Sequence, residues 1–283
     1  MKQTRDSGLS PGLYIVATPI GNLSDVSKRA IDVLGNVDLI AVEDSRVTGK
    51  LLHHLGIKRP MTPYHDHNAD HVRPKLVADM AEKAVALVSD AGTPLISDPG
   101  YKLVRDARDA GHMVTTIPGP CAAIAALTLA GLPTDRFLFA GFLPQKTKAR
   151  DDAIAELASL RATLVFYESG PRLGATLAAL AAGLGARDAA VMREITKMFE
   201  QAIAGTLEQL AAQYADNAPK GEIVIVVGPP EQSQPADAVD ADALLVEALG
   251  HLSPARAASE VAQATGLPRR ELYARALEMK QSR

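Results

Sequence analysis

The sequence predicts an α/β protein of two domains with mostly parallel sheets, followed by a small C-terminal helical domain. Short apolar runs rich in β-branched residues alternate with segments of helical periodicity, as in sheets covered by helices. This pattern restarts after GLPTD (131–135) and ends with the run GEIVIVVG (221–228). A stretch rich in Pro, Asp and Gln then precedes a helical C-terminal segment.

Composition agrees with a globular cytoplasmic protein. The chain has 283 residues, too many for one ordinary core, with 47% hydrophobic and 22% charged residues. No apolar run reaches the length of about eighteen residues that a membrane span needs, and the polar start resembles no signal peptide. The lone Cys121 fits a reducing compartment. Because the net charge is −3, any nucleic-acid binding must be local.

Turn signals and changes in composition give the domain boundaries. We expect a flexible tail at 1–12, an N-terminal α/β domain at 13–131, a second α/β domain at 132–229, a linker at 230–242 and a helix-turn-helix-like domain at 243–283.

The elements of the first domain follow from periodicity. Apolar runs predict buried strands at 13–18, 37–44, 61–64, 84–90 and 113–120. Helical spacing predicts helices after a Ser24 cap, at 48–55, at 72–83, after Asp98 and at 122–130. The last of these helices is apolar on all sides, which predicts burial and makes Cys121 a small core residue rather than a reactive thiol.

The second domain repeats the alternation. Apolar runs predict strands at 137–144, 162–169, 189–195 and 221–228. Helical spacing predicts helices at 151–160, 173–184 and 206–214.

Unusual residues follow four strands of the first domain, in the segments TPIGN, EDSR, SDAGTP and PGPCA. Ligands of parallel α/β sheets bind outside the carboxyl ends of the strands, so this edge is the candidate site. Asp90 beside Ala91 and Gly92 could accept hydrogen bonds from ribose hydroxyls or an amine, or could close an Asx turn. Asp98 before Pro99 reads as a helix N-cap.

Some other functions of this edge of the sheet remain possible, and others lack their sequence motifs. Glu43 has a spacing that would suit a dinucleotide fold, but G-x-G-x-x-G is absent, as are G-x-x-x-x-G-K-[ST] and G-x-S-x-G. His65 and His67 could bind a metal, although polar lining of a site or a solvated loop is the preferred reading, and we expect no metal. The basic segment QKTKAR (145–150) grips phosphates or is a solvated loop.

Several long motifs resemble the tetrapyrrole (corrin/porphyrin) methylase family, and within it the members that methylate ribosomal RNA. They cover residues 13 to 228 in order and are ATPIGNLSDVSKRA, AVEDSRVTGKLL, YHDHN, LVSDAGTPLISDPG, IPGPCAAIAAL, GFLPQK, FYES, REITKMFEQ and KGEIVIVVG. The resemblance implies two α/β domains that bind S-adenosylmethionine in a cleft, usually in a homodimer. It also implies 2′-O-methylation of a cytidine in the decoding centre of 16S rRNA in the small ribosomal subunit, with no membrane or DNA partner.

The resemblance also implies the cofactor contacts. Carried over residue by residue, they are Pro19, Ile20, Asp90, Ala91, Gly92, Thr93, Pro94, Cys121, Ala122, Tyr167, Glu168 and Ser169. The family often has serine in place of Cys121, and a Pro-His-Arg run where this chain has Gly170-Pro171-Arg172. Any role of that histidine is therefore absent.

Methyl transfer to a ribose hydroxyl needs alignment and a base. We expect the base among Glu43, Asp44 and His65, which follow predicted strands at the same edge. Substrate contacts are expected from Arg46, Lys50, Asn68, Lys146, Lys148, Arg150, Arg172 and Arg193. Salt-bridged structural networks are the alternative role for these charged groups. Two other functions remain as alternatives, a methylase of small tetrapyrroles (precorrin or uroporphyrinogen) and a non-catalytic ribosome-assembly binder.

Overall fold

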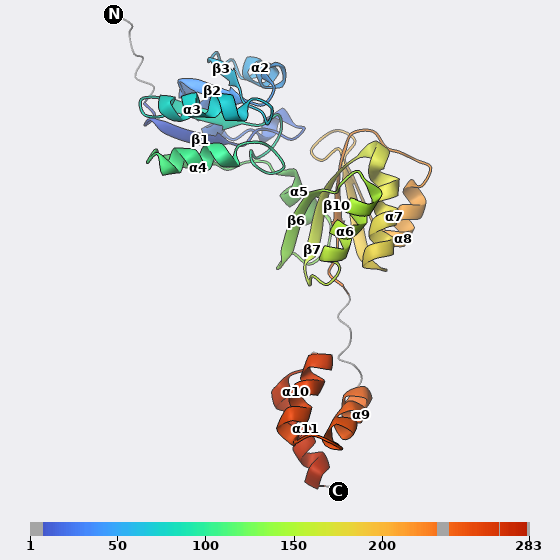
Figure 1. The fold of residues 1–283 in the computed structure, drawn as a ribbon. Coiled ribbons are helices and arrows are strands. Elements are labelled where there is room, and N and C mark those ends of the chain that lie inside the picture. Colours follow the sequence, from blue (N-terminus) through green and yellow to red (C-terminus); the bar gives the residue numbers. More distant parts are fainter. Residues whose placement is uncertain (1–7, 231–237, 266, 282–283) are drawn as a thin grey trace, which may run out of the picture. The chain divides into compact units, whose positions relative to one another are not determined.

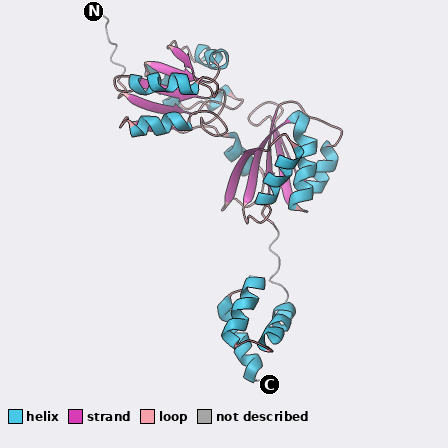
Figure 2. Ribbon diagram, in the orientation of Figure 1, coloured by secondary structure: helices cyan, strands magenta, loops and turns pink. Residues whose placement is uncertain are grey.

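The computed structural model describes residues 8–230, 238–265 and 267–281, and the chain divides into two compact units, residues 1–229 and 230–283. The larger unit contains two sheets, each flanked by helices, and the smaller unit is helical (Figure 1; Figure 2). The predicted fold class, α/β with two sheets and an extra helical domain, is confirmed.

The first sheet is wholly parallel. Its strands are β1 (Gly12–Val16), β2 (Leu39–Val42), β3 (Met61–Pro63), β4 (Ala84–Val88) and β5 (Val114–Ile117). They lie in the order β3-β2-β4-β1-β5. The central strand β4 has the sequence AVALV and is buried on both faces, as expected for a parallel sheet covered on both sides.

Helices cover both faces of this sheet. The helices are α1 (Lys28–Asn36), α2 (Ser45–His54), α3 (Ala69–Asp79) and α4 (Tyr101–Asp109). Ala86 and Val88 of β4 pack in one cluster with side chains of α1 and α2, whereas Val85 and Leu87 pack with side chains of α3 and α4. The alternation of side chains along β4 therefore joins two cores.

The second sheet is mixed. Its strands are β6 (Phe137–Phe142), β7 (Thr163–Ser169), β8 (Asp188–Arg193), β9 (Gln201–Thr206) and β10 (Glu222–Val227), in the order β6-β7-β10-β8-β9. β6 pairs with β7 in parallel, and the other three pairs are antiparallel. The expectation of mostly parallel sheets is thus wrong for this half. β9 was not expected either, because QAIAGT at the sheet edge has neither a buried run nor strict alternation.

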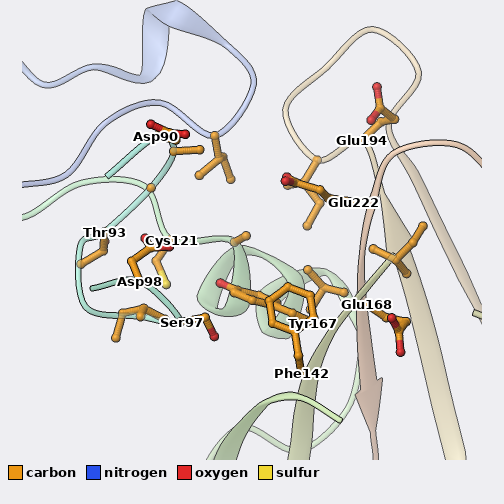
Figure 3. A pocket seen from close by; sticks show the side chains of 18 of the residues that line it. Asp90, Thr93, Ser97, Asp98, Cys121, Phe142, Tyr167, Glu168, Glu194 and Glu222 are labelled. Carbon is orange, nitrogen blue, oxygen red and sulfur yellow. The ribbon is translucent and has the colours of Figure 1, made fainter. Parts of the chain in front are cut away.

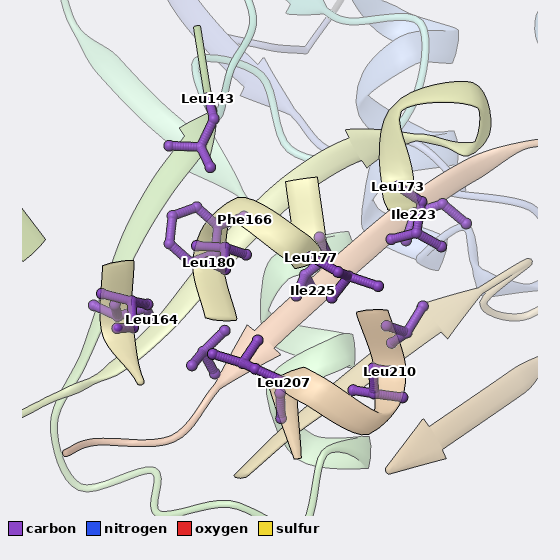
Figure 4. Close-up of a cluster of buried hydrophobic side chains, with 14 of the residues drawn as sticks. Leu143, Leu164, Phe166, Leu173, Leu177, Leu180, Leu207, Leu210, Ile223 and Ile225 are labelled. Carbon is purple, nitrogen blue, oxygen red and sulfur yellow. The ribbon is translucent and has the colours of Figure 1, made fainter. Parts of the chain in front are cut away.

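Helices also cover the second sheet on both faces. The helices α6 (Thr147–Leu157), α7 (Leu173–Leu184) and α8 (Leu207–Tyr214) share one core with it, shown in Figure 4. The other face packs against α5 (Ala122–Leu129). Since α5 precedes the boundary expected after residue 131, the first part of the chain supplies a helix to the second sheet.

Two helix starts differ from expectation. Ser24 does not cap α1: residues Leu23–Asp25 form a short 3-10 helix, and the hydroxyl of Ser27 accepts a hydrogen bond from the Ala30 amide. Asp98 does not cap α4, which begins at Tyr101 after Gly100, without a side-chain cap.

The C-terminal unit consists of α9 (Ala238–Leu249), α10 (Pro254–Thr265) and α11 (Arg269–Gln281). The three helices enclose their own core, which includes Leu245, Ala257, Val261 and Leu272. α9 begins within the segment 230–242 expected as linker, of which residues 231–237 lie outside the described part of the chain.

Leu177 tests the core of the second sheet. It is fully buried in the cluster of Figure 4, so we expect Leu177→Ala to lower the free energy of unfolding by about 2–5 kcal/mol through lost burial and a cavity. The matched control is Leu160→Ala, because Leu160 is 38% exposed, and there we expect a change within about 0.5 kcal/mol. Urea unfolding followed by circular dichroism measures both. Equal losses in the two variants would contradict this account of the core.

Candidate active site

A cavity of about 280 Å³ lies where loops of the first sheet meet the second sheet and α5 (Figure 3). We call it the acidic cavity, because six carboxyl side chains line it: Glu43, Asp90, Asp98, Glu168, Glu194 and Glu222. Among the lining residues, all of which the structure describes, Lys197 is the single lysine or arginine. The remaining lining is apolar or small and comprises Ile20, Ala91, Gly92, Thr93, Ile96, Ser97, Cys121, Ala122, Phe142, Tyr167, Ile195, Ile223 and Val224.

Backbone hydrogen bonds join the loops that follow β1 and β4. The Thr18 amide donates to the Gly92 carbonyl at 2.9 Å, and the Gly92 amide donates to the Thr18 carbonyl at 3.1 Å. Gly92 has a φ of +79°, which favours glycine, and a Cβ there would lie 3.2 Å from Cγ2 of Ile20. The hydroxyl of Thr93 donates to the Pro120 carbonyl at 2.9 Å, which ties in the loop before α5.

Asp90 joins the loops that follow β2 and β4. Its Oδ1 accepts a hydrogen bond from the Asp44 amide at 3.0 Å, and its own amide donates to Oε2 of Glu43 at 3.4 Å. Burial raises the pKa of both carboxyls, and the hydrogen bonds from these amides oppose that rise. Asp90 thus fixes the site structurally and also lines it.

Asp98 lines the acidic cavity instead of starting a helix. Leu95 and Ser97 both have positive φ values, 74° and 64°, which are uncommon for residues other than glycine. Gly100 follows with a φ of 139°. These turns keep the chain irregular up to Tyr101 and leave Asp98 among the lining residues, near Cys121 in Figure 3.

The environment of Asp98 favours its neutral form. Burial is the main cause that raises the pKa of this carboxyl to about 6, and the negative charges of Glu43, Asp90 and Glu222 add to it. A hydrogen bond with the Ser89 side chain acts in the opposite direction. Asp98 therefore changes protonation state much closer to neutral pH than an ordinary aspartate does.

Tyr167 forms an aromatic wall of the cavity. Its hydroxyl accepts a hydrogen bond from the Ala123 amide at 3.1 Å, in the first turn of α5. The rings of Phe139 and Phe142 lie edge-on to Tyr167, with centroids 4.9 Å and 5.6 Å away. Burial raises the pKa of Tyr167 above its usual range, so the phenol stays protonated.

Glu168 is buried and held by several donors. Its carboxylate accepts hydrogen bonds from the Ser169 amide at 2.8 Å and from the Thr176 hydroxyl at 2.7 Å. The Arg172 guanidinium lies 3.4 Å from Oε2 and also donates to the Leu143 carbonyl at 2.8 Å. These contacts make Glu168 and Arg172 a structural pair beneath the cavity.

Most of the expected cofactor contacts come together here. Nine of the twelve line the acidic cavity: Ile20, Asp90, Ala91, Gly92, Thr93, Cys121, Ala122, Tyr167 and Glu168. Pro19, Pro94 and Ser169 are not among the lining residues.

The three residues expected as the base differ in their position relative to the cavity. Glu43 lines the cavity, and Asp44 and His65 do not. Asp44 caps α2 and binds Arg46, whose hydrogen bonds lower the pKa of Asp44 to about 2, too low for a base near neutral pH. Nδ1 of His65 is buried without a hydrogen-bond partner in the described part of the chain.

The expected substrate contacts lie outside the cavity lining. Arg46, Lys50, Lys146 and Lys148 are exposed. Asn68 holds its own turn, because its side chain accepts from the His65 amide and donates to the Pro63 carbonyl. Arg150 lies 3.5 Å from Asp151, and the Nε atoms of Arg150 and Arg193 are buried without hydrogen-bond partners in the described structure.

Several residues that line the cavity were not predicted from the sequence, because their sequence patterns are weak or indicate another role. Asp98 stands before Pro99 and reads as a cap. Glu194 and Lys197 follow β8 of the second sheet, whereas the sequence predicts the site at the carboxyl ends of the first-sheet strands. Glu222 begins β10, and this strand runs antiparallel to β7 and β8.

The chain belongs to the tetrapyrrole (corrin/porphyrin) methylase family, whose model matches residues 12–211. A second model, described as the RsmI C-terminal HTH domain, matches residues 235–280. The chain is similar to proteins named ribosomal RNA small subunit methyltransferase I. One from Erythrobacter litoralis (strain HTCC2594) is 60% identical over 272 residues, with 96% of each chain covered. One from Mesorhizobium japonicum (strain LMG 29417 / CECT 9101 / MAFF 303099) is 50% identical over 275 residues, with 96% of this chain and 93% of that one covered.

A solved structure shares the fold at low sequence identity. It is uroporphyrin-III C-methyltransferase from Thermus thermophilus, complexed with S-adenosylhomocysteine. It is 18% identical, with a TM-score of 0.53, and the match covers 77% of this chain and 97% of that one. At this identity the likeness concerns the fold alone.

The described residues contain neither a metal-binding cluster nor a membrane-spanning helix. No three His, Cys, Asp or Glu side chains in residues 8–230, 238–265 and 267–281 come together as ligands for a metal ion. None of the helices described there has the length and apolar character to cross a membrane.

Asp98 makes a pH-dependent contribution to stability. Because its pKa rises from 3.8 to about 6 on folding, the folded state binds more protons than the unfolded state between these values, and stability falls as pH rises through them. Asp98→Asn removes this loss. We therefore expect the free energy of unfolding of the variant, relative to that of the wild type, to be about 1–2 kcal/mol higher at about pH 8 than at about pH 4, after allowance for solvent screening. Urea unfolding at both pH values measures the gain.

The control for this prediction is Asp109→Asn, at an exposed position of α4 outside the acidic cavity. We expect no comparable gain there. If Asp98→Asn shows the same pH dependence of unfolding as the wild type, the raised pKa of Asp98 is wrong.

Proposed function

We propose that this protein transfers the methyl group of S-adenosylmethionine to the ribose 2′-hydroxyl of a cytidine in the decoding centre of 16S rRNA. Membership of a methylase family supports the methyl transfer. The names of the relatives, at 60% and 50% identity over nearly the whole chain, support ribosomal RNA of the small subunit as the substrate.

The acidic character of the cavity is the observation that carries the proposal for the cofactor. S-adenosylmethionine has a sulfonium and an ammonium group, and six carboxyl groups against one lysine suit such a cation. Apolar side chains from Ile20, Ile195 and Val224 and the Tyr167 ring suit its adenine and thioether portions. When bound, the cofactor supplies an electrophilic methyl group whose departure leaves a neutral sulfide.

Three loops would hold the cofactor. The backbone around Ala91 and Gly92 allows close approach, because Gly92 has no side chain. Asp90 offers a carboxylate to hydroxyl or ammonium groups, and Cys121 and Ala122 line the cavity where α5 begins. Since hydrogen bonds fix these loops to one another, the cavity is preorganised for its ligand.

A carboxylate in the cavity would take the proton of the ribose hydroxyl. Asp98 suits this role, because its pKa of about 6 lies close to neutral pH and it lines the cavity. As the ribose oxygen forms its bond to the methyl carbon, its proton passes to a carboxylate oxygen of Asp98. Glu43 is the second candidate, although its Oε2 already accepts the Asp90 amide.

The remaining parts of the proposal concern context. We propose a cytoplasmic homodimer that acts on the small ribosomal subunit, with the C-terminal unit of α9, α10 and α11 as an additional RNA contact. The match of residues 235–280 to a helix-turn-helix domain supports that contact.

Mapping of ribose methylation by mass spectrometry tests the function. We expect small subunits from a strain that lacks this protein to lack one 2′-O-methylcytidine in the decoding centre, and purified protein with S-adenosylmethionine to restore it. Calorimetry should detect binding of S-adenosylmethionine. Methylation of precorrins but not of subunits would indicate a small-molecule methylase, and binding to subunits without binding of the cofactor would indicate an assembly factor.

Substitutions of carboxyl groups test the proposed base. We expect Asp98→Asn to lower kcat by about 100-fold or more, because the proton acceptor is lost, and to raise the Kd for S-adenosylmethionine by a much smaller factor, because five of the six carboxyl groups remain. Asp44→Asn addresses the competing candidate outside the cavity lining. Because Asn caps a helix about as well as Asp does and the pair with Arg46 is exposed and contributes little, we expect this variant to keep both its stability and its turnover. Full activity of Asp98→Asn would exclude Asp98 as the base and direct attention to Glu43→Gln.

A further inference from the structure

The loop that joins β8 to β9 exposes two neighbouring apolar side chains. Met198 is 90% exposed and Phe199 is 69% exposed, the highest values among the large hydrophobic residues that the structure describes. Single exposed apolar residues are common on proteins, but consecutive ones with so little contact are candidates for a binding surface. We call this pair the apolar tip.

The backbone beneath the tip is fixed by local contacts. Glu194 and Thr196 have positive φ values, 54° and 68°, although neither is glycine. The Thr196 amide donates to Oε2 of Glu200 at 2.6 Å, and Nζ of Lys197 binds Oε1 of Glu194 at 3.0 Å. Such conformations persist only where surrounding contacts hold them, so the loop presents its tip in a defined position.

The same loop packs against the turn after β1. The Asn22 amide donates to the Thr196 hydroxyl at 3.0 Å. A Cβ on Gly21 would lie 2.7 Å from Cγ of Lys197 and 2.8 Å from Oγ1 of Thr196, so only glycine fits without displacement. The tip is therefore held by both halves of the larger unit.

The loop also forms part of the acidic cavity. Glu194, Ile195 and Lys197 line it, and Figure 3 shows Glu194 in this loop beside Glu222. Met198 directly follows a lining residue and is itself almost fully solvent-exposed. The tip thus follows directly, along the chain, a residue that lines the cavity, and we infer that it lies at the rim of that cavity.

We propose that Phe199 and Met198 stack against an unpaired base of the RNA substrate, next to the nucleotide whose ribose enters the acidic cavity. This inference rests on the proposed function. A ribose can reach a cavity only if its nucleotide leaves the base stack, and the neighbouring base then presents a free apolar face. Aromatic side chains cover such faces, whatever the base.

Charge also favours a stacking contact at this rim. Glu168 and Glu194 are paired with Arg172 and Lys197, and the four other carboxyl groups of the cavity lining repel RNA phosphates. A stacking contact without charge at the rim avoids this repulsion. Because the loop is already fixed, stacking on the tip needs little further ordering of the protein.

A second copy of the chain fits the tip less well than a base does. A stable protein interface buries about 800 Å² on each partner, whereas two side chains supply only a small part of such an area. A partner seated on the rim would also obstruct the entrance for RNA.

Methylation of small subunits from a strain that lacks the protein tests the inference. We expect Phe199→Ala to lower kcat/KM by about 10-fold, as the loss of one stacked base predicts, and Phe199→Trp to keep the wild-type value. Calorimetry should give the same Kd for S-adenosylmethionine in all variants. The matched control is Tyr101→Ala, since Tyr101 is 63% exposed and does not line the cavity.

The outcomes separate the inference from the proposed function. No methyl transfer by the wild type overturns both. An active wild type with unchanged kcat/KM in Phe199→Ala overturns the stacking contact alone. A change of oligomeric state in Phe199→Ala, measured by light scattering, also overturns it, because the tip would then be a contact between subunits.

Discussion

The site depends on the pair of backbone hydrogen bonds between Thr18 and Gly92. They join the ends of β1 and β4, which are neighbours in the first sheet. With this junction fixed, Asp90 can reach the Asp44 amide and Thr93 can reach the Pro120 carbonyl. Gly92 makes the arrangement possible, because its positive φ suits a residue without Cβ. A small backbone contact therefore organises four loops into one wall.

The crowding of carboxyl groups has an energetic cost that indicates what the cavity binds. Burial is the main cause that raises the pKa of Asp98, Glu43 and Asp90, and nearby negative charges add to this rise. A cationic ligand relieves this repulsion, so binding and the ionised state of the carboxyl groups reinforce one another. Under the proposed function, the same field would oppose an anionic RNA backbone, and the apolar tip would offer the substrate an uncharged contact.

The sequence predicted the fold class. Nine of the twelve residues that it predicted as cofactor contacts line one cavity. Apolar runs sufficed for β1, β2 and β4 of the parallel sheet, which are short, apolar and largely buried. They failed for the edge strand β9, whose residues are small and partly exposed. Asp98 was misread since Asp-Pro-Gly resembles a helix start, and only the backbone turns at Leu95 and Ser97 direct it elsewhere. The contributions of Glu194 and Glu222 depend on the mixed pairing of the second sheet, which local sequence does not specify.

The passage of the chain into α5 has a mechanical consequence. α5 packs on the second sheet, while Pro120 just before it is bound by Thr93 of the first half. Residues 118–121 are thus a short connecting segment along one wall of the cavity, and Pro118 and Pro120 restrict its backbone. A Cβ on Gly119 would lie 3.0 Å from the Cβ of Ala17, so this segment also packs closely against the end of β1. Because residues 118–121 connect β5 directly to α5, the length of this segment limits how far the two sheets can separate on this side of the cavity.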